Sequence, residues 1–481
     1  MRFNVVIRYV GVVLLMNALF MLISAIIGLF NGMDTGFYPL LLSFFLTTAL
    51  GAFPLIFVES ERNITSKEAY LIVVGSWLAA CFMGMMPYML WGGEFHIVNA
   101  WFESVSGFST TGATILDNVE VLPRSLLFWR SSTHWLGGIG VVMFMMLILP
   151  SMGQARQTLS NAQISSLAKD NFRYKAQKIV QILLVVYLGL TLLQTICLKV
   201  AGMGWFDSLN HAFSTVATGG FSTKNASIGY FDSIGIEVVT FIFMLVGGMH
   251  FGLIYATVIG RRNNILSSEV TRFYLLSILL AGVTIALVLW SGGYYESFWK
   301  SLRYGGFQLL SMMTTTGFVT ANSNVWPPFA ILILIFFSIT CACAGSTSGG
   351  IKADRLLLSL KSMTGRIRQM QHPNAIIRVK MNGVSMPESM MQMVNVFILL
   401  YLMIILLGTA IFALLGLDLM TAFSVSFSSM SNVGPGFGEI GGFETYAHLS
   451  VPVKMTSTLL MLLGRLEIFG LIQIFYFKAW R

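Results

Sequence analysis

SerThrThrGlyAlaThr at 109–114 is the first of four short stretches, rich in Ser, Thr and Gly, that interrupt an otherwise apolar sequence; the others are AlaThrGlyGlyPhe at 217–221, ThrThrThrGlyPheVal at 314–319 and SerAsnValGlyProGly at 431–436. Each stretch lies between two hydrophobic runs that are long enough to span a bilayer. Backbone carbonyls in such loops can replace the water around a small cation, and glycine permits the dihedrals that point them toward one axis. The pattern predicts four loops around one pore.

The composition of the chain indicates an integral membrane protein. Of its 481 residues, 56% are hydrophobic and only 10% are charged, which is far from the composition of a soluble domain. A membrane-spanning helix needs about 20 apolar residues. Ten candidate runs lie near residues 9–30, 37–58, 69–91, 126–149, 180–200, 238–259, 273–291, 326–359, 390–416 and 451–477. The sequence therefore predicts an all-α polytopic membrane protein without a separate soluble domain.

The Lys and Arg residues predict the orientation of these spans, because cytoplasmic loops of membrane proteins carry an excess of positive charge. Most of the 29 basic residues fall in one alternate set of connecting segments, namely 1–8, 59–68, 151–178, 260–272, 351–390 and 478–481. We therefore expect both ends of the chain in the cytoplasm. The basic charge is then a topological signal, and it gives no reason to expect nucleic-acid binding.

All four loops fall on the outer side in this topology. Glycines 112, 219, 317 and 434 recur at intervals of roughly 100 residues, which indicates an internal repeat. A short apolar segment precedes each loop, at 97–108, 206–216, 298–313 and 420–430. These segments are too short to cross a membrane, so they fit half-helices that enter it and stop. The predicted units are an N-terminal helix pair at 1–66 and four pore repeats at 67–155, 156–262, 263–372 and 373–481.

Three further motifs accompany the loops: GlyProGlyPheGlyGlu at 434–439, CysAlaGlySerThrSerGlyGlyIleLys at 343–352 and GlyArgLeuGluIlePhe at 464–469. With these residues the chain resembles the Trk/Ktr/HKT superfamily of potassium transporters, in particular the bacterial TrkH-type membrane subunits. The resemblance implies four unlike repeats around one K⁺ pathway in the inner membrane, each donating one filter glycine, and two extra helices at the N-terminus. Some relatives that admit Na⁺ carry serine at the first filter glycine, so by this resemblance Gly112 favours K⁺.

The resemblance also implies which residues bind the transported K⁺. Position by position, the filter residues are Thr110, Thr111, Gly112, Ala113, Thr218, Gly219, Gly220, Thr315, Thr316, Gly317, Phe318, Asn432, Val433 and Gly434. The filter glycines among them are Gly112, Gly219, Gly317 and Gly434. The loops differ in the residues beside these glycines, so we expect a pore that is only pseudo-fourfold.

The run at 343–350 places small residues and two adjacent glycines inside the eighth apolar span. Glycine weakens a helix, and the backbone groups that it frees need polar partners, so this segment should face water or other protein. The resemblance implies an intramembrane loop that obstructs the pore and acts as a gate, formed by Ala344, Gly345, Ser346, Thr347, Ser348, Gly349 and Gly350. A simple packing kink is the alternative.

Arg465 is a charged residue near the middle of the tenth span, where an ionisable side chain is costly and needs a partner or water. Glu467 is two residues away and does not share its helix face. The resemblance implies that Arg465 contacts the loop at Gly345–Gly350 from across the pore and latches the gate. The alternative is a side chain that extends along the helix to the inner interface.

The resemblance further implies a homodimer that binds a cytosolic nucleotide-binding regulatory ring of the TrkA type, for which the basic inner segments could be the docking face. We expect K⁺ as the transported ion and no organic cofactor. An enzyme would need paired carboxylates or a nucleophile beside a base, and the sequence shows neither pattern. A secondary transporter coupled to Na⁺ or H⁺ is the alternative function; it would be expected to show charged residues near the midplane.

Overall fold

The structure is a computed structural model that describes residues 2–59, 65–148, 176–260, 264–375 and 377–468. Most of the predicted inner segment 151–178, the end of the tenth span and the segment 478–481 lie outside these residues. Within them the chain is mainly helical. The strands form one antiparallel hairpin, in which β1 (Lys380–Met381) pairs with β2 (Val384–Ser385).

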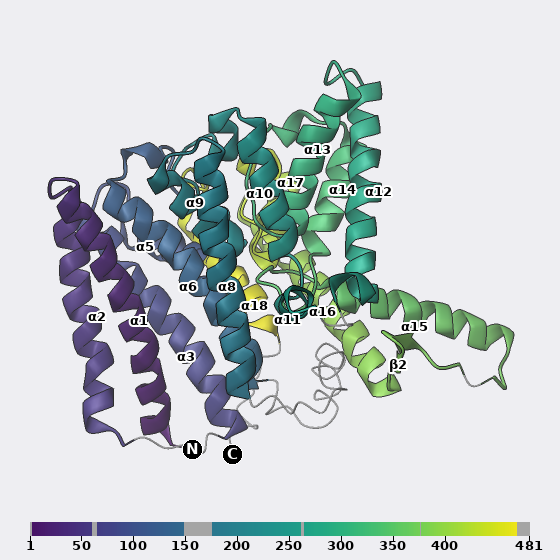
Figure 1. Ribbon diagram of the computed structural model, residues 1–481, viewed down its shortest axis with the longest axis horizontal. Helices are drawn as coiled ribbons and strands as arrows, with labels where there is room; N and C mark the ends of the chain where they lie inside the picture. The colour runs from purple at the N-terminus through teal and green to yellow at the C-terminus, as the bar shows by residue number, and fades with distance from the viewer. Residues whose placement is uncertain (1, 60–64, 149–175, 261–263, 376, 469–481) are drawn as a thin grey trace.

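The N-terminal helices α1 (Phe3–Phe30) and α2 (Phe37–Phe57) form a pair at the left edge of the molecule (Figure 1). A Cβ on Gly11 would collide with the carbonyl oxygen of Gly51, so glycine lets the two helix backbones approach closely. Their outer faces expose large apolar side chains such as Phe53. An apolar outer face is suited to lipid rather than water.

Four short helices point into the centre of the molecule, and each one leads into one of the loops rich in Ser, Thr and Gly. They are α5 (Ile97–Phe108), α9 (Trp205–Val216), α13 (Phe298–Met313) and α17 (Leu419–Ser431). The longest has 16 residues, or about 24 Å of helix, which is less than the roughly 30 Å of a hydrocarbon core. The four predicted half-helices are therefore confirmed as short helices.

Other helices precede and follow each of the four. They are α3 (Ser66–Gly84), α4 (Met86–Trp91), α6 (Arg124–Ile148), α8 (Ala176–Val200), α10 (Ile234–Gly247), α11 (Phe251–Val258), α12 (Glu269–Ser291), α14 (Pro328–Ile339), α16 (Glu388–Leu414) and α18 (Val451–Arg465). Short 3₁₀ turns lie in the connections: η1 (Val119–Val121), η3 (Ser227–Phe231), η4 (Ile265–Ser267), η5 (Ser323–Val325) and η6 (Gly438–Ile440). In chain order, each of the four short helices and its loop thus lies between other helices.

Six helices in the described part of the chain are long and apolar enough to cross a membrane, and the bent pair α10 and α11 could make a seventh. Two of the ten predicted spans are interrupted in the structure. The predicted span 238–259 bends by 104° between α10 and α11. The predicted span 326–359 is divided into α14 and a second helix, α15 (Ala353–Gln371), by the non-helical segment 340–352. This second break lies where the small residues had predicted one.

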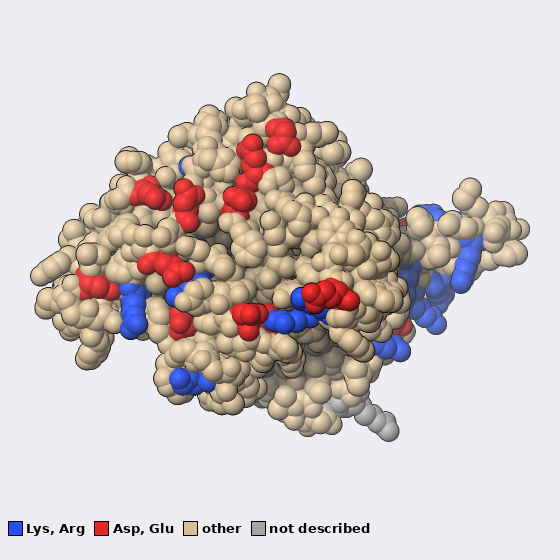
Figure 2. Space-filling view, turned by 90° about the horizontal axis from the view of Figure 1, so that it is seen from above, with Lys and Arg blue, Asp and Glu red and all other residues tan. Residues whose placement is uncertain are grey.

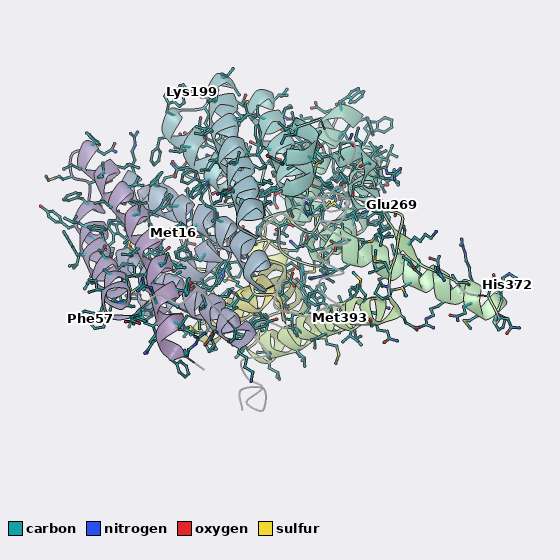
Figure 3. All side chains as sticks on the ribbon, turned by 60° about the horizontal axis from the view of Figure 1, so that its bottom comes forward. Met16, Phe57, Lys199, Glu269, His372 and Met393 are labelled. Carbon is teal, nitrogen blue, oxygen red and sulfur yellow. The ribbon has the colours of Figure 1, made fainter. Side chains whose placement is uncertain are left out.

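Helix α15 projects from the body as an arm, with the β-hairpin below it (Figure 1). Figure 3 shows His372 at the tip of this arm and Glu269 near its base, on the opposite side of the molecule from Phe57. Lys and Arg side chains gather on the arm, whereas Asp and Glu side chains are spread over the upper face of the body (Figure 2). This separation of charge agrees in direction with the predicted basic inner segment 351–390.

Candidate functional site

The four short helices end with the same backbone hydrogen bond. In each, an amide five residues beyond a serine donates to the carbonyl oxygen of that serine. The pairs are Thr111 with Ser106 (2.9 Å), Gly219 with Ser214 (2.8 Å), Thr316 with Ser311 (2.9 Å) and Val433 with Ser428 (3.0 Å). This shared bond fixes the register in which the four loops correspond.

The residue before each amide donor has a left-handed backbone. The four are Thr110 (φ 53°), Thr218 (φ 54°), Thr315 (φ 56°) and Asn432 (φ 58°). A positive φ is unfavourable for a β-branched residue such as threonine. It costs about 1–3 kcal/mol and persists only where the surrounding structure imposes it, which happens most often at functional sites.

The residue after each amide donor is a glycine, and these four glycines join the loops into a closed ring. The glycine ring consists of Gly112 (φ 80°), Gly220 (φ 85°), Gly317 (φ 73°) and Gly434 (φ 95°). A Cβ on each would lie 2.0–2.4 Å from a carbonyl oxygen of the next loop: that of Gly219, Thr316, Val433 and Thr111, in the same order. Each ring glycine therefore lies against the backbone of the following loop, and the fourth loop lies against the first. A side chain cannot be accommodated at any of the four positions.

The second loop corrects the glycine assigned from the sequence. The sequence spacing pairs Gly219 with the other three filter glycines. In the structure, however, Gly220 is the residue that shares their positive φ and their close approach to a carbonyl oxygen of the next loop. Gly219 is small for a different reason: a Cβ there would collide with the ring of His134, which stacks on Phe221 at 4.0 Å. Two adjacent glycines are therefore needed in this loop, one for each constraint.

Above the glycine ring the structure has a pocket of about 90 Å³, which all four ring glycines line. Acidic residues surround it, including Asp117 and Glu444 in its lining and Glu120 nearby, and acidic side chains are prominent on this face (Figure 2). Lys224 also lines the pocket, 3.3 Å from Glu120. Burial lowers the pKa of Lys224, but the hydrogen bond to the Glu120 carboxylate and the charge interactions with Glu120, Tyr230 and Asp207 together outweigh burial, so the pKa is raised. The negative charge of this mouth would attract cations.

The connections beyond the ring are also joined in a circle. From first to second, the Val119 amide donates to Asn225 (2.7 Å); from second to third, Gly229 donates to Val319 (3.1 Å); from third to fourth, Asn324 donates to Gly438 (3.0 Å); from fourth to first, Tyr446 donates to Thr114 (2.8 Å). Segments that are far apart in the sequence are thereby held at fixed positions around the pocket.

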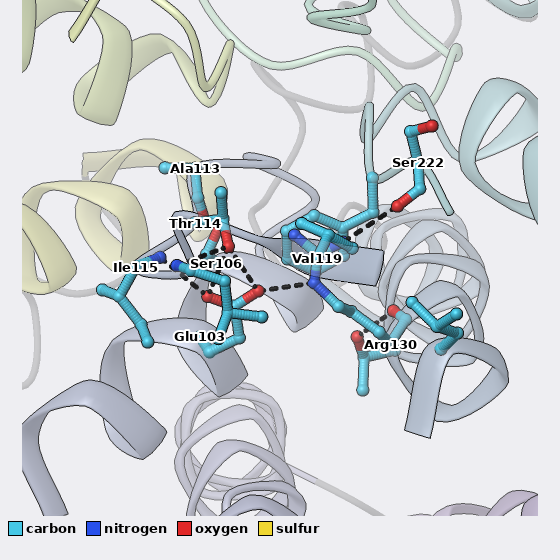
Figure 4. A network of polar contacts seen from close by, with 12 residues as sticks. Glu103, Ser106, Ala113, Thr114, Ile115, Val119, Arg130 and Ser222 are labelled. Atoms are coloured by element: carbon cyan, nitrogen blue, oxygen red, sulfur yellow. Dashed lines mark hydrogen bonds and ion pairs between the residues drawn. The ribbon is translucent and has the colours of Figure 1, made fainter. Parts of the chain in front are cut away.

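A buried ion pair supports the first two loops (Figure 4). Arg130 of α6 donates from Nε to Glu103 of α5 at 2.6 Å, and both side chains are almost fully buried. The Glu103 carboxylate also accepts from the Thr114 hydroxyl and from the Ile115 amide (3.1 Å). Arg130 in turn donates to the Ser222 carbonyl at 3.2 Å. A single ion pair thus reaches both loops.

The segment 340–352 lies directly under the loops and is buried over most of its length. The Thr347 hydroxyl donates to the carbonyl oxygen of Val216 at 2.8 Å, just before the second loop. The Gly349 amide donates to the hydroxyl of Thr315 in the third loop at 2.8 Å. On its other side, Cys343 donates to Gly248 at the α10–α11 bend (2.9 Å). The segment therefore contacts the second and third loops on one side and the α10–α11 bend on the other.

Arg465 contacts this segment, as expected. Its Nη1 donates to the Thr347 carbonyl oxygen at 2.8 Å, and the side chain is 5% exposed, which excludes extension to the inner interface in this conformation. Its Nε and Nη2 have no hydrogen-bond partner among the described residues. Glu467 pairs instead with Arg355 at 2.8 Å. Lys352 adds a second buried cation, which binds the Ser348 carbonyl and hydroxyl.

The structure brings together the residues that the sequence singled out. The predicted filter residues lie in and beside the glycine ring, the predicted gate residues Ala344 to Gly350 contact the second and third loops, and Arg465 donates to Thr347 among the gate residues. Sequence reasoning missed Glu103 and Arg130. Both were visible as charges inside a predicted half-helix and a predicted span, and the rule applied to Arg465 would have found them.

Comparisons with known proteins agree with this geometry. A profile of the family TrkH, described as cation transport protein, matches residues 40–478. The Trk system potassium uptake proteins TrkH from Salmonella typhimurium and Halomonas elongata are 32% and 33% identical, and each alignment covers 100% of both chains. The crystal structure of the potassium transporter TrkH from Vibrio parahaemolyticus has a TM-score of 0.91 and 30% identity, over 100% of both chains.

Proposed function

The chain belongs to the TrkH family of cation transport proteins, and from that premise we propose that this multi-pass membrane protein carries K⁺ into the cell through the glycine ring. The closed ring of four backbone contacts carries this proposal. The ligands would be the carbonyl and hydroxyl oxygens of the predicted filter residues, which replace the hydration shell of K⁺. The acidic mouth above the ring would supply ions to it.

The four loops would come from four pseudo-repeats, at 67–155, 156–262, 263–372 and 373–481, with residues 1–66 as an additional helix pair. Support comes from the common hydrogen bond at the end of each short helix and from the common left-handed residue that follows. The protein would lie in the bacterial inner membrane with the glycine ring toward the outside and both ends in the cytoplasm. The basic arm at α15 would then face the cytoplasm, in line with the positive-inside rule.

The segment from Ala344 to Gly350 would be the gate of this pathway, with Arg465 as its latch. It would close the space under the loops, and hydrogen bonds of Thr347 and Gly349 with the second and third loops and one from Arg465 hold it there. A positively charged side chain beneath the ring would also repel an entering K⁺. Opening would require these bonds to break and the segment to move away from the axis.

In the cell the protein would act as a homodimer bound to a cytosolic nucleotide-binding ring. The relatives are named as potassium uptake proteins of a Trk system, which implies further components. The exposed basic residues of α15, among them Arg366 and Arg368, provide a surface for such a partner. K⁺ is the transported ion in this proposal, with no organic cofactor.

Uptake of radioactive Rb⁺ into proteoliposomes loaded with K⁺ tests the proposal. The purified protein should take up Rb⁺ in preference to Na⁺, and Gly112→Ser should reduce that preference about tenfold or more because the new side chain meets the backbone of Gly219. Gly306→Ala is the matched control, since a Cβ at this α13 glycine has open space. Uptake that requires a Na⁺ or H⁺ gradient would instead indicate coupled transport.

A further inference from the structure

One position recurs in all four short helices, three residues before the serine that accepts the shared hydrogen bond. It is occupied by Glu103, His211, Gln308 and Val425, which we call the brace position. All four side chains are at most 1% exposed. Three of the four are polar, although the site is buried within the protein, where a polar group without a partner is costly.

In the first repeat, Glu103 holds the chain immediately after the ring glycine. Its carboxylate accepts from the hydroxyl of Thr114 (3.0 Å) and from the amide of Ile115 (3.1 Å), and it pairs with Arg130. The Arg130 guanidinium lies 3.6 Å from the ring centroid of Phe221 in the second loop. This brace therefore connects two loops, and its hydrogen bonds are of the strong, charge-assisted kind.

In the second and third repeats, the brace side chain makes its hydrogen bonds only within its own repeat. His211 has Nδ1 against the carbonyl oxygen of Asp207 (2.8 Å), which assigns the proton to Nδ1 and leaves Nε2 to accept from the Ser222 hydroxyl (2.9 Å). Gln308 donates to the carbonyl oxygen of Ala321 at 3.0 Å. Both contacts are neutral, so each contributes less than the ion pair.

In the fourth repeat, Val425 makes no hydrogen bond through its side chain, and a different residue takes over. The Tyr446 hydroxyl donates to the carbonyl oxygen of the ring glycine Gly434 at 3.1 Å, and Ser428 donates to the same oxygen at 2.8 Å. Tyr446 is almost fully buried. The fourth loop is thus held from both directions, by Ser428 in the helix before the loop and by Tyr446 beyond it.

We propose that the brace position, together with Tyr446 in the fourth repeat, holds each loop in the strained geometry that discriminates between cations. The reason is physical: left-handed threonines persist only under external constraint. The brace side chains bond the chain that follows the ring glycines in the first three repeats, and Tyr446 bonds the ring glycine of the fourth, in addition to the bonds made by the serines of the short helices. The unequal braces make the four positions unequal in their effect on selectivity. The inference rests on the proposed filter function and names the residues that position it.

The test compares the Rb⁺ to Na⁺ uptake ratio with the rate of Rb⁺ uptake in proteoliposomes for four variants. Gln308→Met and Tyr446→Phe each remove one hydrogen bond at nearly constant volume, and each should lower the ratio about fivefold while the protein retains its thermal stability within a few degrees. Glu103→Gln, which leaves Arg130 without its charge partner, should lower the ratio most. Val425→Ala removes packing but no hydrogen bond, and it should leave the ratio unchanged.

The ratio of the two uptake rates separates positioning from folding, because a partly unfolded sample lowers both rates together. An unchanged ratio in both Gln308→Met and Tyr446→Phe would overturn the inference even if Glu103→Gln does not fold. An equal fall in Val425→Ala would overturn it as well, because packing alone would then explain the effect. If Gly112→Ser changes the ratio while these variants do not, the proposed filter function is supported and the proposed role of the brace position is wrong. If the unaltered protein does not discriminate between Rb⁺ and Na⁺, the proposed function itself fails.

Discussion

The glycine ring and the segment at 344–350 are neighbours, but they are built in opposite ways. The ring repeats one arrangement in four loops. Each ring glycine lies so close to the backbone of the next loop that no side chain fits between them. The segment beneath it exists once, and side-chain hydroxyls and one guanidinium contribute its bonds to the loops and to α18. Close-packed backbone cannot adjust in small steps, whereas single hydrogen bonds of about 1 kcal/mol can break and re-form. The difference teaches that one region is suited to fixed geometry and the other to movement.

Substitution of a ring glycine should have the largest effect on Rb⁺ uptake. The second loop allows a direct comparison, because a ring glycine and a glycine outside the ring are adjacent there. Gly220→Ala places a Cβ against the Thr316 backbone at a positive φ, so we expect Rb⁺ uptake to fall more than tenfold. Gly219→Ala meets only the His134 ring, a side chain that can be shortened. The double variant Gly219→Ala with His134→Ala should therefore recover uptake, whereas Gly220→Ala combined with His134→Ala should not. Recovery in both, measured in proteoliposomes, would show that the ring is not rigid.

Removal of the guanidinium from the gate gives the next largest effect. Arg465→Gln loses the bond to Thr347 and the positive charge beneath the ring, so Rb⁺ uptake by the protein without a regulatory partner should rise about tenfold, the value of a charged hydrogen bond. Arg366→Gln is the control, because this exposed arginine pairs with Glu388 on the surface. Equal uptake in Arg465→Gln and in the unaltered protein would contradict the latch.

A single hydroxyl in the segment should have a smaller effect. Thr347→Val keeps the shape of the side chain but loses the bond to Val216, so Rb⁺ uptake should rise about fivefold if that bond holds the gate closed. Ser346→Ala serves as the comparison, because the Ser346 hydroxyl bonds within the segment, to Cys343. A larger rise for Ser346→Ala than for Thr347→Val would mean that internal folding of the segment, and not its contact with the loop, controls opening.

The smallest expected effect concerns the outer end of α17, where Asp418 accepts hydrogen bonds from the amides of Met420 and Thr421. Hydrogen bonds from Thr421 and Met420 lower the pKa of Asp418. The carboxylate therefore stabilises the fold above about pH 4, the ordinary range of an aspartate, and this contribution is lost as the pH falls through the lowered pKa. At pH 7, Asp418→Ala should cost about 0.5–1 kcal/mol.

The measurement is the thermal midpoint in detergent at a series of pH values. Asp418→Ala should lower the midpoint by about 2 °C at pH 7, and the gap should close toward pH 3. Asp418→Asn keeps an acceptor at the helix start without a charge, so its gap should stay small at every pH. Loss of ion selectivity in Asp418→Ala would be unexpected, because this cap lies a full helix away from the ring.

Much of this arrangement could be predicted from the sequence, because its main signals are local. The short apolar segments before the glycine loops predicted the bounds of the four short helices to within one or two residues. The small residues at 343–350 predicted the break between α14 and α15. The charge of Arg465, with no partner on its own helix face, predicted a contact with another segment, and the family resemblance implied that this segment is the loop that contains Thr347. Apart from that resemblance, these inferences depend on chain periodicity or on the cost of burying a charge.

What could not be predicted depends on contacts between distant segments. The choice between Gly219 and Gly220 is decided by His134 and Thr316, which lie about 85 and 96 residues away in sequence. The bend of 104° between α10 and α11 comes at Gly248 and His250, whose neighbours are residues of the gate segment. The hydropathy pattern alone predicts one span for such a bent pair of helices, because a bend changes the path of the chain but not its composition.

The central claim is that four unlike loops form one cation site at the glycine ring, and anomalous scattering from crystals soaked in Rb⁺ tests it most directly. The account predicts anomalous density on the axis of the ring, among the carbonyl oxygens of Thr111, Gly219, Thr316 and Val433, and its replacement when K⁺ is added in excess. Density confined to the acidic mouth above the ring, or absent from the axis in crystals that bind Rb⁺ elsewhere, would contradict it.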